Sequence, residues 1–215
     1  MRIIIERERT SAEVILYALY LYFLGLSFRS TSKAIQPFGK EGRSHVAIWK
    51  WVQRFNPERL YHRKRVSAFL IDETMLQIGN EEAWLWVAVE PIHKQTNSWS
   101  LYSRHRNMIV AESFLRSLIK IYGKHIVYSD GGTWYPEACI FLGLEQRLHS
   151  PYEKSIVERT MEYLKDRTEV FDDYYYPCRK AGLCDLLHVH KWLTLFVFMH
   201  NSIVKSSSKF HNMMR

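Results

Sequence analysis

The chain has 215 residues, of which 47% are hydrophobic and 14% aromatic, so it can bury a core and wholesale disorder is excluded. Its net charge of +8 is unevenly distributed: residues 1–66 hold 13 Lys and Arg against 5 Asp and Glu, whereas residues 67–215 hold 17 of each. A basic module joined to an electrically balanced one indicates that the first part binds a polyanion. The longest apolar run, at 14–26, has 13 residues and is too short to cross a bilayer. The preceding residues lack a signal-peptide cleavage site, so a cytoplasmic protein without a membrane segment is expected.

The basic first third predicts three helices. They are expected at 11–25, 30–37 and 44–55, with N-caps at Ser11, at Ser30 or Thr31, and at Ser44. Three helices with a tight turn before the third are typical of a DNA-binding helix-turn-helix, whose third helix enters the major groove. The candidate DNA contacts on that helix are Ser44, His45, Lys50 and Arg54. An ordinary three-helix cluster without DNA contacts remains the alternative interpretation.

The helical pattern also predicts which side of the third helix is buried. The side expected to pack inward carries Ile48, Trp49, Val52 and Phe55, and the side expected to face outward carries Ala47, Lys50, Trp51 and Arg54. A basic stretch, "YHRKR", then follows and is expected to lie along a phosphate backbone through Arg63, Lys64 and Arg65. The predicted organisation is a helix-turn-helix domain at 1–60, a linker at 61–66, a second domain at 67–204 and a tail at 205–215.

The second domain alternates strand-like and helix-like segments. Strands are expected at 67–78, 83–91, 94–104, 125–130 and 145–150, and helices at 107–123, 135–144, 154–171 and 183–201. Three antiparallel-type strands followed by alternating helices and strands predict an α/β domain, with a mixed five-stranded sheet flanked by helices.

Three acids stand at positions that suggest chemistry. Asp72 is expected to end the first strand, Asp130 to end the fourth, and Glu158 to lie early in a long helix beside its packed face. If the first and fourth strands are neighbours, the two aspartates meet at the carboxyl ends of the strands. Successive strand residues face opposite sides, so Glu73 should point away from Asp72. Three converging carboxylates need cations between them, and oxygen ligands select Mg²⁺ or Mn²⁺. Two such ions about 4 Å apart can catalyse reactions at a phosphodiester.

A zinc site can also be drawn from Cys178, Cys184, His188 and His190. Its spacing matches no usual structural zinc motif. The two histidines are also two positions apart in a predicted helix, where they do not share a face.

Several blocks of the chain resemble DDE transposases of the insertion-sequence-six family. The blocks are "FLIDET", "WLWVAVEP", "YSDGGTWYPEACIFLGLEQRLHS" and "IVERTMEYLKDRTEVFDDYYYP", which occur in the family's order with 27 residues between Asp130 and Glu158. The resemblance covers roughly residues 10 to 200, including the preceding helices.

The resemblance implies an integrase-type, RNase H-like catalytic domain whose metal-binding triad is Asp72, Asp130 and Glu158. Lys165 matches the family's basic residue on the last of these helices, and Arg159 of the same helix is a further candidate DNA contact. The implied activity is metal-dependent cleavage and strand transfer of the element's inverted repeats, by two Mg²⁺ or Mn²⁺ ions, in a homodimer or larger assembly associated with the nucleoid. The alternatives are an inactive DNA-binding repressor and an RNase H-like nuclease that cuts without joining.

Overall fold

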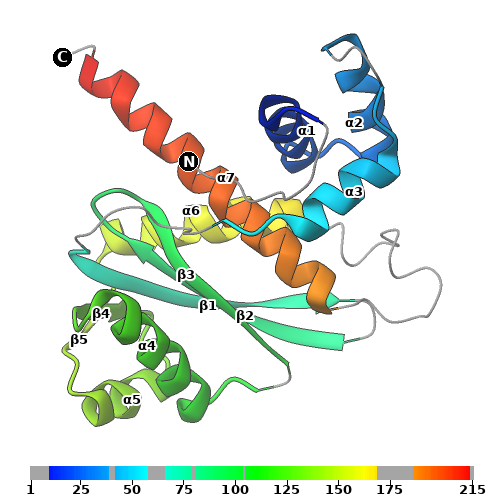
Figure 1. Ribbon diagram of the computed structural model, residues 1–215. Helices are drawn as coiled ribbons and strands as arrows, with labels where there is room; N and C mark the ends of the chain where they lie inside the picture. The colour runs from blue at the N-terminus through cyan, green and yellow to red at the C-terminus, as the bar shows by residue number, and fades with distance from the viewer. Residues whose placement is uncertain are drawn as a thin grey trace. The chain divides into compact units, whose positions relative to one another are not determined.

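The computed structural model describes two compact units. They are Met1–Leu60 with Asp185–Ser202, and Tyr61–Cys184 with Ile203–Arg215 (Figure 1). The described residues are 10–38, 42–57, 66–78, 81–103, 105–168 and 186–213. Within these ranges, no helix combines the length and hydropathy that a membrane span requires.

The first unit is entirely helical in its described part. Its helices are α1 (Ala12–Phe23), α2 (Phe28–Ile35), the 3₁₀ turn η1 (Gln36–Phe38), α3 (His45–Arg54) and the first part of α7 (Leu186–Met213). As predicted, Ser11 caps α1 and Ser44 caps α3, each by accepting a hydrogen bond from a backbone N–H three residues later. Helix α2 begins earlier than predicted, because Ser27 and not Ser30 or Thr31 is its N-cap.

Two tryptophans of α3 exchange their predicted sides. Trp51 is buried to 1% exposure, whereas Trp49 is half-buried. The side that Ile48, Val52 and Trp51 share therefore packs inward, and the exposed side carries Val46, with Lys50 one turn later. The helical register was predicted correctly, but the wide indole of Trp51 at the border of the stripe was assigned to the wrong face.

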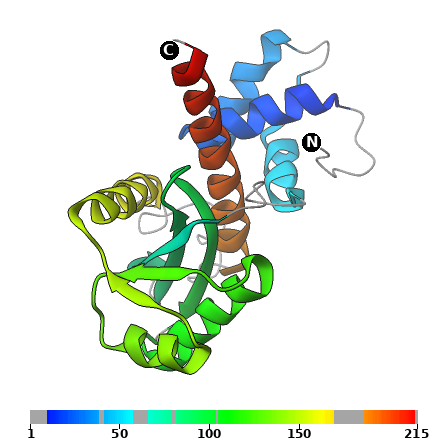
Figure 2. The same ribbon diagram turned by 90° about the vertical axis from the view of Figure 1, so that its left-hand side faces the viewer.

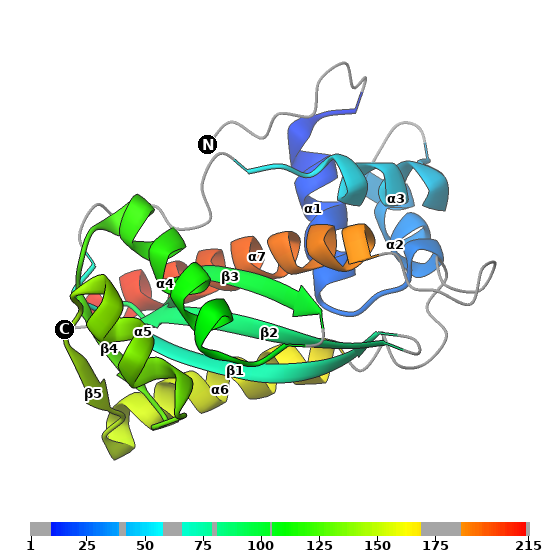
Figure 3. The same cartoon turned by 90° about the horizontal axis from the view of Figure 1, so that it is seen from below.

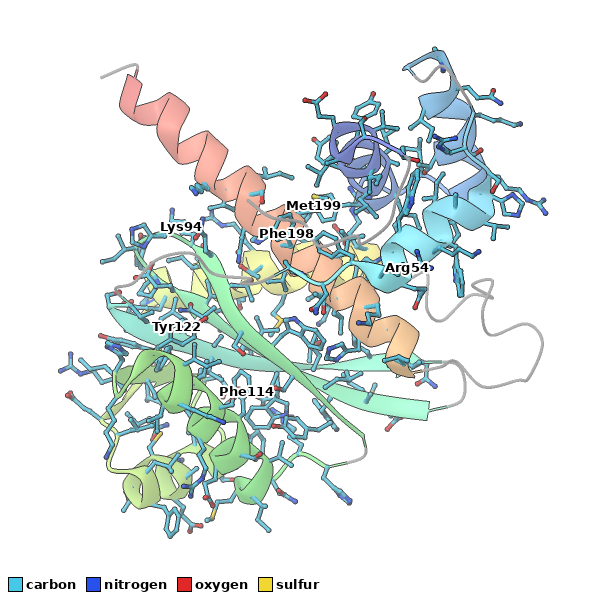
Figure 4. All side chains as sticks on the ribbon, in the orientation of Figure 1. Arg54, Lys94, Phe114, Tyr122, Phe198 and Met199 are labelled. Atoms are coloured by element: carbon cyan, nitrogen blue, oxygen red, sulfur yellow. The ribbon has the colours of Figure 1, made fainter. Side chains whose placement is uncertain are left out.

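The division into units differs from the predicted domain boundaries at residues 185–202. The sequence pattern assigned this helix to the second domain, but it clusters with the first unit. The reason is aromatic packing: Phe196 lies 5.7 Å from Phe23 between ring centroids, and Phe198 lies 5.1 Å from Phe55. Figure 4 shows Phe198 and its neighbour Met199 on this part of α7.

The second unit contains a five-stranded mixed sheet in the order β3-β2-β1-β4-β5. Its strands are β1 (Ala68–Ile78), β2 (Glu81–Glu90), β3 (Gln95–Ser103), β4 (Ile126–Ser129) and β5 (Gln146–Leu148). β1, β2 and β3 form an antiparallel meander, whereas β4 runs parallel to β1 and β5 runs parallel to β4. The first and fourth strands are therefore neighbours, which is the condition under which the two aspartates were expected to meet.

Helices cover both faces of this sheet. They are α4 (Met108–Tyr122), α5 (Trp134–Leu142) and α6 (Pro151–Thr168). Figures 2 and 3 show α4 and α5 on one face and α6 on the other. Together with the all-helical N-terminal region, this confirms the predicted architecture, a mixed five-stranded sheet flanked by helices.

The core between the sheet and α4 is built from large apolar side chains. Phe114 of α4 contacts Trp86 of β2 at 6.0 Å between ring centroids, and Tyr122 donates a hydrogen bond to the Asn97 carbonyl (Figure 4). Ile109 of this helix is 73% exposed. The helix begins at Met108, so Ile109 lies in its first turn, before the stripe of Ala111, Phe114, Leu115 and Leu118 reaches the sheet.

Candidate active site

Asp72 lies inside a strand, and not at the strand end that the sequence suggested. β1 continues to Ile78 because its antiparallel pairing with β2 runs as far as the pair Ile78–Glu81. On its other side β1 pairs with β4 only from Ala68 to Leu70. Asp72 therefore lies beyond the end of the parallel ladder, where, among the described residues, one side of β1 has no strand beside it.

Asp130 follows β4 directly, at the start of a glycine turn. Its Oδ1 accepts a hydrogen bond of 3.0 Å from the backbone N–H of Gly132, and Gly131 has a φ of +89°, which favours glycine. A Cβ on Gly132 would stand 2.7 Å from the indole of Trp134. The "SDGG" sequence is thus required by this turn, which holds Asp130 against the end of β4.

Glu158 comes from α6, the helix that packs against β1. Val157, next to it, is buried, and Glu158 itself stands on the exposed border of the helix, as predicted. It completes a cleft of about 400 Å³ that all three predicted acids line. The lining residues are Asp72, Ser129, Asp130, Leu148, His149, Lys154, Val157 and Glu158.

The cleft makes negative charge unfavourable at Asp72. Burial, the charge of neighbouring Glu73 and the charge of Asp130 raise the pKa of Asp72 to about 7, although a hydrogen bond from the Glu73 N–H and the charge of Lys165 oppose the shift. A carboxylate that is disfavoured by burial and by another carboxylate is stabilised when a cation binds beside it. The donor set of the cleft, carboxylate oxygens, suits a hard divalent ion.

The side chain of Glu158 is turned toward Lys154. Its Oε1 lies 3.7 Å from the Lys154 Nζ, and both side chains are more than half exposed. Within the described ranges, no three His, Cys, Asp or Glu side chains stand close enough together to hold a metal ion. The three acids therefore share one cleft but do not stand close enough together to hold one ion.

Glu73 faces away from Asp72, as the two-residue period of a strand predicts. It is 7% exposed, its Oε1 accepts hydrogen bonds from Arg106, and its Oε2 accepts one from the Tyr135 hydroxyl. The Arg106 guanidinium lies 4.7 Å from the centroid of Trp84 and 4.2 Å from that of Trp134. This cluster joins Glu73 of β1 to Trp134 and Tyr135 of α5. It therefore fixes β1, which carries Asp72, and the turn before α5, which carries Asp130.

The predicted DNA contacts fall on several elements. On α3, Ser44, Lys50 and Arg54 are exposed and His45 is half-buried, and Figure 4 shows Arg54 at the end of the helix. The Ser44 hydroxyl accepts a hydrogen bond from the Ala47 N–H, so this side chain acts as a helix cap. On α6, Arg159 and Lys165 are exposed, and Arg159 donates a hydrogen bond to Ser155. Arg63, Lys64 and Arg65 lie outside the described residues, as do Cys178 and Cys184 of the alternative zinc site.

His149 lines the cleft and was not among the predicted site residues. It directly follows β5, as Asp130 directly follows β4, and its backbone N–H donates to the Ser129 carbonyl. The signal was present in the sequence, since a histidine stood near the end of a predicted strand. What the sequence could not show is that β5 pairs with β4 and brings this strand end to the two aspartates.

Sequence comparisons relate the chain to an uncharacterized protein over most of its length and to insertion-sequence transposases over about half of it. The chain is 30% identical to the uncharacterized protein MJ0017 of Methanocaldococcus jannaschii over 206 residues, which cover 93% of this chain and 91% of that protein. It is 29% identical over 124 residues to the transposase for insertion sequence element IS257 in transposon Tn4003 of Staphylococcus aureus, with 54% of each chain covered. The chain thus aligns with about half the length of that transposase. No protein-family model matches the chain.

Among solved structures, the catalytic core domain of BIV integrase superposes with a TM-score of 0.42 and 18% identity, covering 61% of this chain and 82% of that one. On the sequence comparisons, the chain belongs to one family with MJ0017 and is a homologue of the insertion-sequence-six transposases that include IS257.

Proposed function

We propose that this chain is a transposase that binds the ends of its own mobile element and catalyses divalent-metal-dependent DNA cleavage and strand transfer. The observation that carries the proposal is the shared cleft of Asp72, Asp130 and Glu158, three acids that are 58 and 28 positions apart in the sequence. The homology to insertion-sequence transposases supports the same conclusion.

In this proposal, Asp72, Asp130 and Glu158 hold Mg²⁺ or Mn²⁺, as two ions. The ions would lower the pKa of the attacking hydroxyl and neutralise charge on the scissile phosphate and the leaving oxygen. The chain's own carboxylates orient the reaction: Asp72 and Asp130 are fixed by the sheet, and Glu158 approaches from α6 on the opposite wall. Lys165 of α6, whose charge already acts on Asp72, would neutralise DNA phosphate near the cut.

The helical unit would supply DNA affinity. Lys50 and Arg54 on the exposed side of α3 are suited to phosphates and base edges, with Arg63, Lys64 and Arg65 of the basic segment extending the contact. Two DNA ends must be processed together, so we infer a homodimer or larger assembly on DNA.

The proposal is tested by strand transfer with the DNA that flanks this reading frame, supplied as a duplex that already ends in a 3′-hydroxyl. Mg²⁺ should support joining to a supercoiled plasmid. Asp72→Asn, Asp130→Asn and Glu158→Gln should each lower the rate by about a thousandfold, because each removes one carboxylate from the cation site. Glu137→Gln on α5, an exposed acid outside the cleft, is the matched control and should keep the wild-type rate.

The two alternatives predict different products. A repressor without catalytic activity would bind the flanking DNA with a steep salt dependence. It would not nick this DNA with any divalent metal ion. A nuclease would nick the plasmid and leave no joined product. A triad variant that retains near-wild-type joining would show that the residue is not part of the site.

A further inference from the structure

His149 occupies the same level of the sheet as the two aspartates. The parallel ladders pair Leu70 with Tyr128 and Ser129 with Leu148. Continuing the same register two residues beyond Leu70 and Tyr128 places Asp72 opposite Asp130. Continuing it one residue beyond Ser129 and Leu148 places Asp130 opposite His149. Side chains at one level of neighbouring parallel strands point to one face, with the strands about 4.8 Å apart. His149 is therefore the third residue of a row that begins with the two aspartates.

The two ring nitrogens of His149 have different surroundings. Burial lowers the pKa of His149 below its usual value, against a hydrogen bond with the Tyr128 backbone and the charges of Asp130, Glu153 and Glu158. The Nε2 atom is shielded from solvent and has no hydrogen-bond partner among the described residues. Because Nε2 has no partner among these residues, we assign the proton of the ring to Nδ1, the nitrogen that is left for the interaction with the Tyr128 backbone. A neutral imidazole that donates from one nitrogen presents a lone pair on the other.

A buried nitrogen without a partner is costly. Leaving such a group unpaired costs about 1–3 kcal/mol, and native proteins keep few of them. Carboxylates that hold a cation are ionised and carry no proton to donate to this nitrogen. A phosphate oxygen of DNA has none either. Of the groups that the reaction itself brings into the cleft, a hydroxyl of water or of a sugar is the one that can donate to a lone pair.

We propose that the Nε2 of His149 accepts a hydrogen bond from the attacking hydroxyl and orients it toward the phosphate. The proposal rests on the transposase function above: the hydroxyl is that of water in cleavage and the terminal 3′-hydroxyl of DNA in strand transfer. Carboxylate oxygens are the better ligands for a hard cation, which leaves the imidazole to the hydroxyl and not to the metal. Because Nε2 is shielded from solvent in this structure, the hydroxyl reaches it when side chains of the cleft shift.

The first test is the tautomer of His149 in the full-length protein, measured by long-range ¹H–¹⁵N NMR and assigned by loss of the signal in His149→Asn. The protein without metal should show a protonated Nδ1 and a bare Nε2. Adding Mg²⁺ and a duplex with a 3′-hydroxyl end should shift Nε2 upfield, the direction expected for a nitrogen that accepts a hydrogen bond. A proton on Nε2 in the free protein, or no shift with the 3′-hydroxyl duplex, overturns the proposal.

The second test compares His149→Asn and His149→Gln with the wild type in nicking of supercoiled plasmid in Mn²⁺. We expect about a hundredfold lower rate, with Mn²⁺ affinity and melting temperature close to wild type. His125→Asn is the control, because His125 lies before β4, at the other end of the strand, with its Nε2 2.9 Å from the Tyr122 carbonyl oxygen. Loss of Mn²⁺ binding in both variants would make His149 a metal ligand and overturn the proposal. A wild-type protein that does not join the 3′-hydroxyl duplex to plasmid would refute the transposase function, whereas full nicking activity in both His149 variants would refute the role of His149 alone.

Discussion

Asp72 and Asp130 each lie two residues beyond the last pair of the parallel ladder, Leu70 and Tyr128, so the two carboxylates stand at one level of neighbouring strands. The relationship follows from unequal strand lengths. β1 continues past Asp72 along β2, whereas β4 stops at Ser129 and turns away through glycine. One aspartate is thus held by an uninterrupted strand and the other by a tight turn, and the burial of Asp72 raises its pKa to about 7.

In the proposed cation site, Lys154 would compete with the cation for Glu158. Replacing it with Gln should raise the affinity for Mn²⁺ about two- to fivefold, since an exposed ion pair contributes up to about 1 kcal/mol. Isothermal titration calorimetry of the metal alone measures this. Lys120→Gln, on the exposed side of α4, should leave the affinity unchanged. A weaker Mn²⁺ affinity in Lys154→Gln would mean that the lysine supports the site instead of opposing it.

The cluster around Glu73 should contribute to stability. Tyr135→Phe removes the hydroxyl that donates to the buried Glu73 carboxylate, and the unfolding free energy should fall by about 1–3 kcal/mol. Urea unfolding measures the change. Tyr152→Phe removes a hydroxyl from a tyrosine that is 59% exposed and should change stability by less than about 0.5 kcal/mol. Equal effects of the two substitutions would show that the Tyr135 hydroxyl has no special part in the cluster.

The ionised Glu90 carboxylate should stabilise the folded protein, and this contribution should be lost in acid. Burial alone would raise its pKa, but hydrogen bonds from Ser67 and from the His93 backbone and ring lower the pKa of Glu90 below its ordinary value of 4.5. The unfolded chain therefore takes up this proton at higher pH than the folded chain does. The contribution is complete above pH 4.5 and is lost as the pH falls through the lower, folded value.

The measurement is the unfolding free energy of Glu90→Gln relative to wild type as a function of pH. The difference should be largest near neutral pH and should shrink below pH 4.5. Glu82→Gln, at an exposed position of β2, should show no such trend. A difference that grows as the pH falls would contradict the sign of the shift.

DNA binding by the helical unit should depend on charge. Lys50→Ala and Arg54→Ala should each weaken binding to the flanking DNA and reduce the slope of log K against log salt by about 0.9, the value for one lost phosphate contact. Fluorescence anisotropy at several salt concentrations measures both quantities. If neither variant differs from Lys120→Ala, the three helices are an ordinary cluster without DNA contacts.

Much of the fold could be predicted because local signals were strong. Ser11 and Ser44 mark helix starts, and runs of β-favouring residues mark the strands of the meander. The positions of Asp72, Asp130 and Glu158 in one cleft followed from strand order and from the border of one helix stripe. Each of these depends on residues near one another in sequence or on a common rule of sheet topology.

The features that could not be predicted depend on tertiary contacts, which the spacing of residues along the sequence does not encode. The extension of β1 beyond Asp72 is set by its partner β2, and the membership of 185–202 in the helical unit is set by Phe196 and Phe198 meeting Phe23 and Phe55. The turn of Glu158 toward Lys154 is a rotamer choice within one helix face. His149 was missed because its importance comes from the pairing of a three-residue strand.

The central claim is that three distant acids bind divalent cations together. Crystals soaked in Mn²⁺ and measured at the manganese absorption edge test it most directly. The account predicts an anomalous peak ligated by Asp72 and Asp130, with Glu158 rotated away from Lys154 to join them. A peak held elsewhere, or a cleft that stays empty at millimolar Mn²⁺ with Glu158 still paired to Lys154, would contradict it.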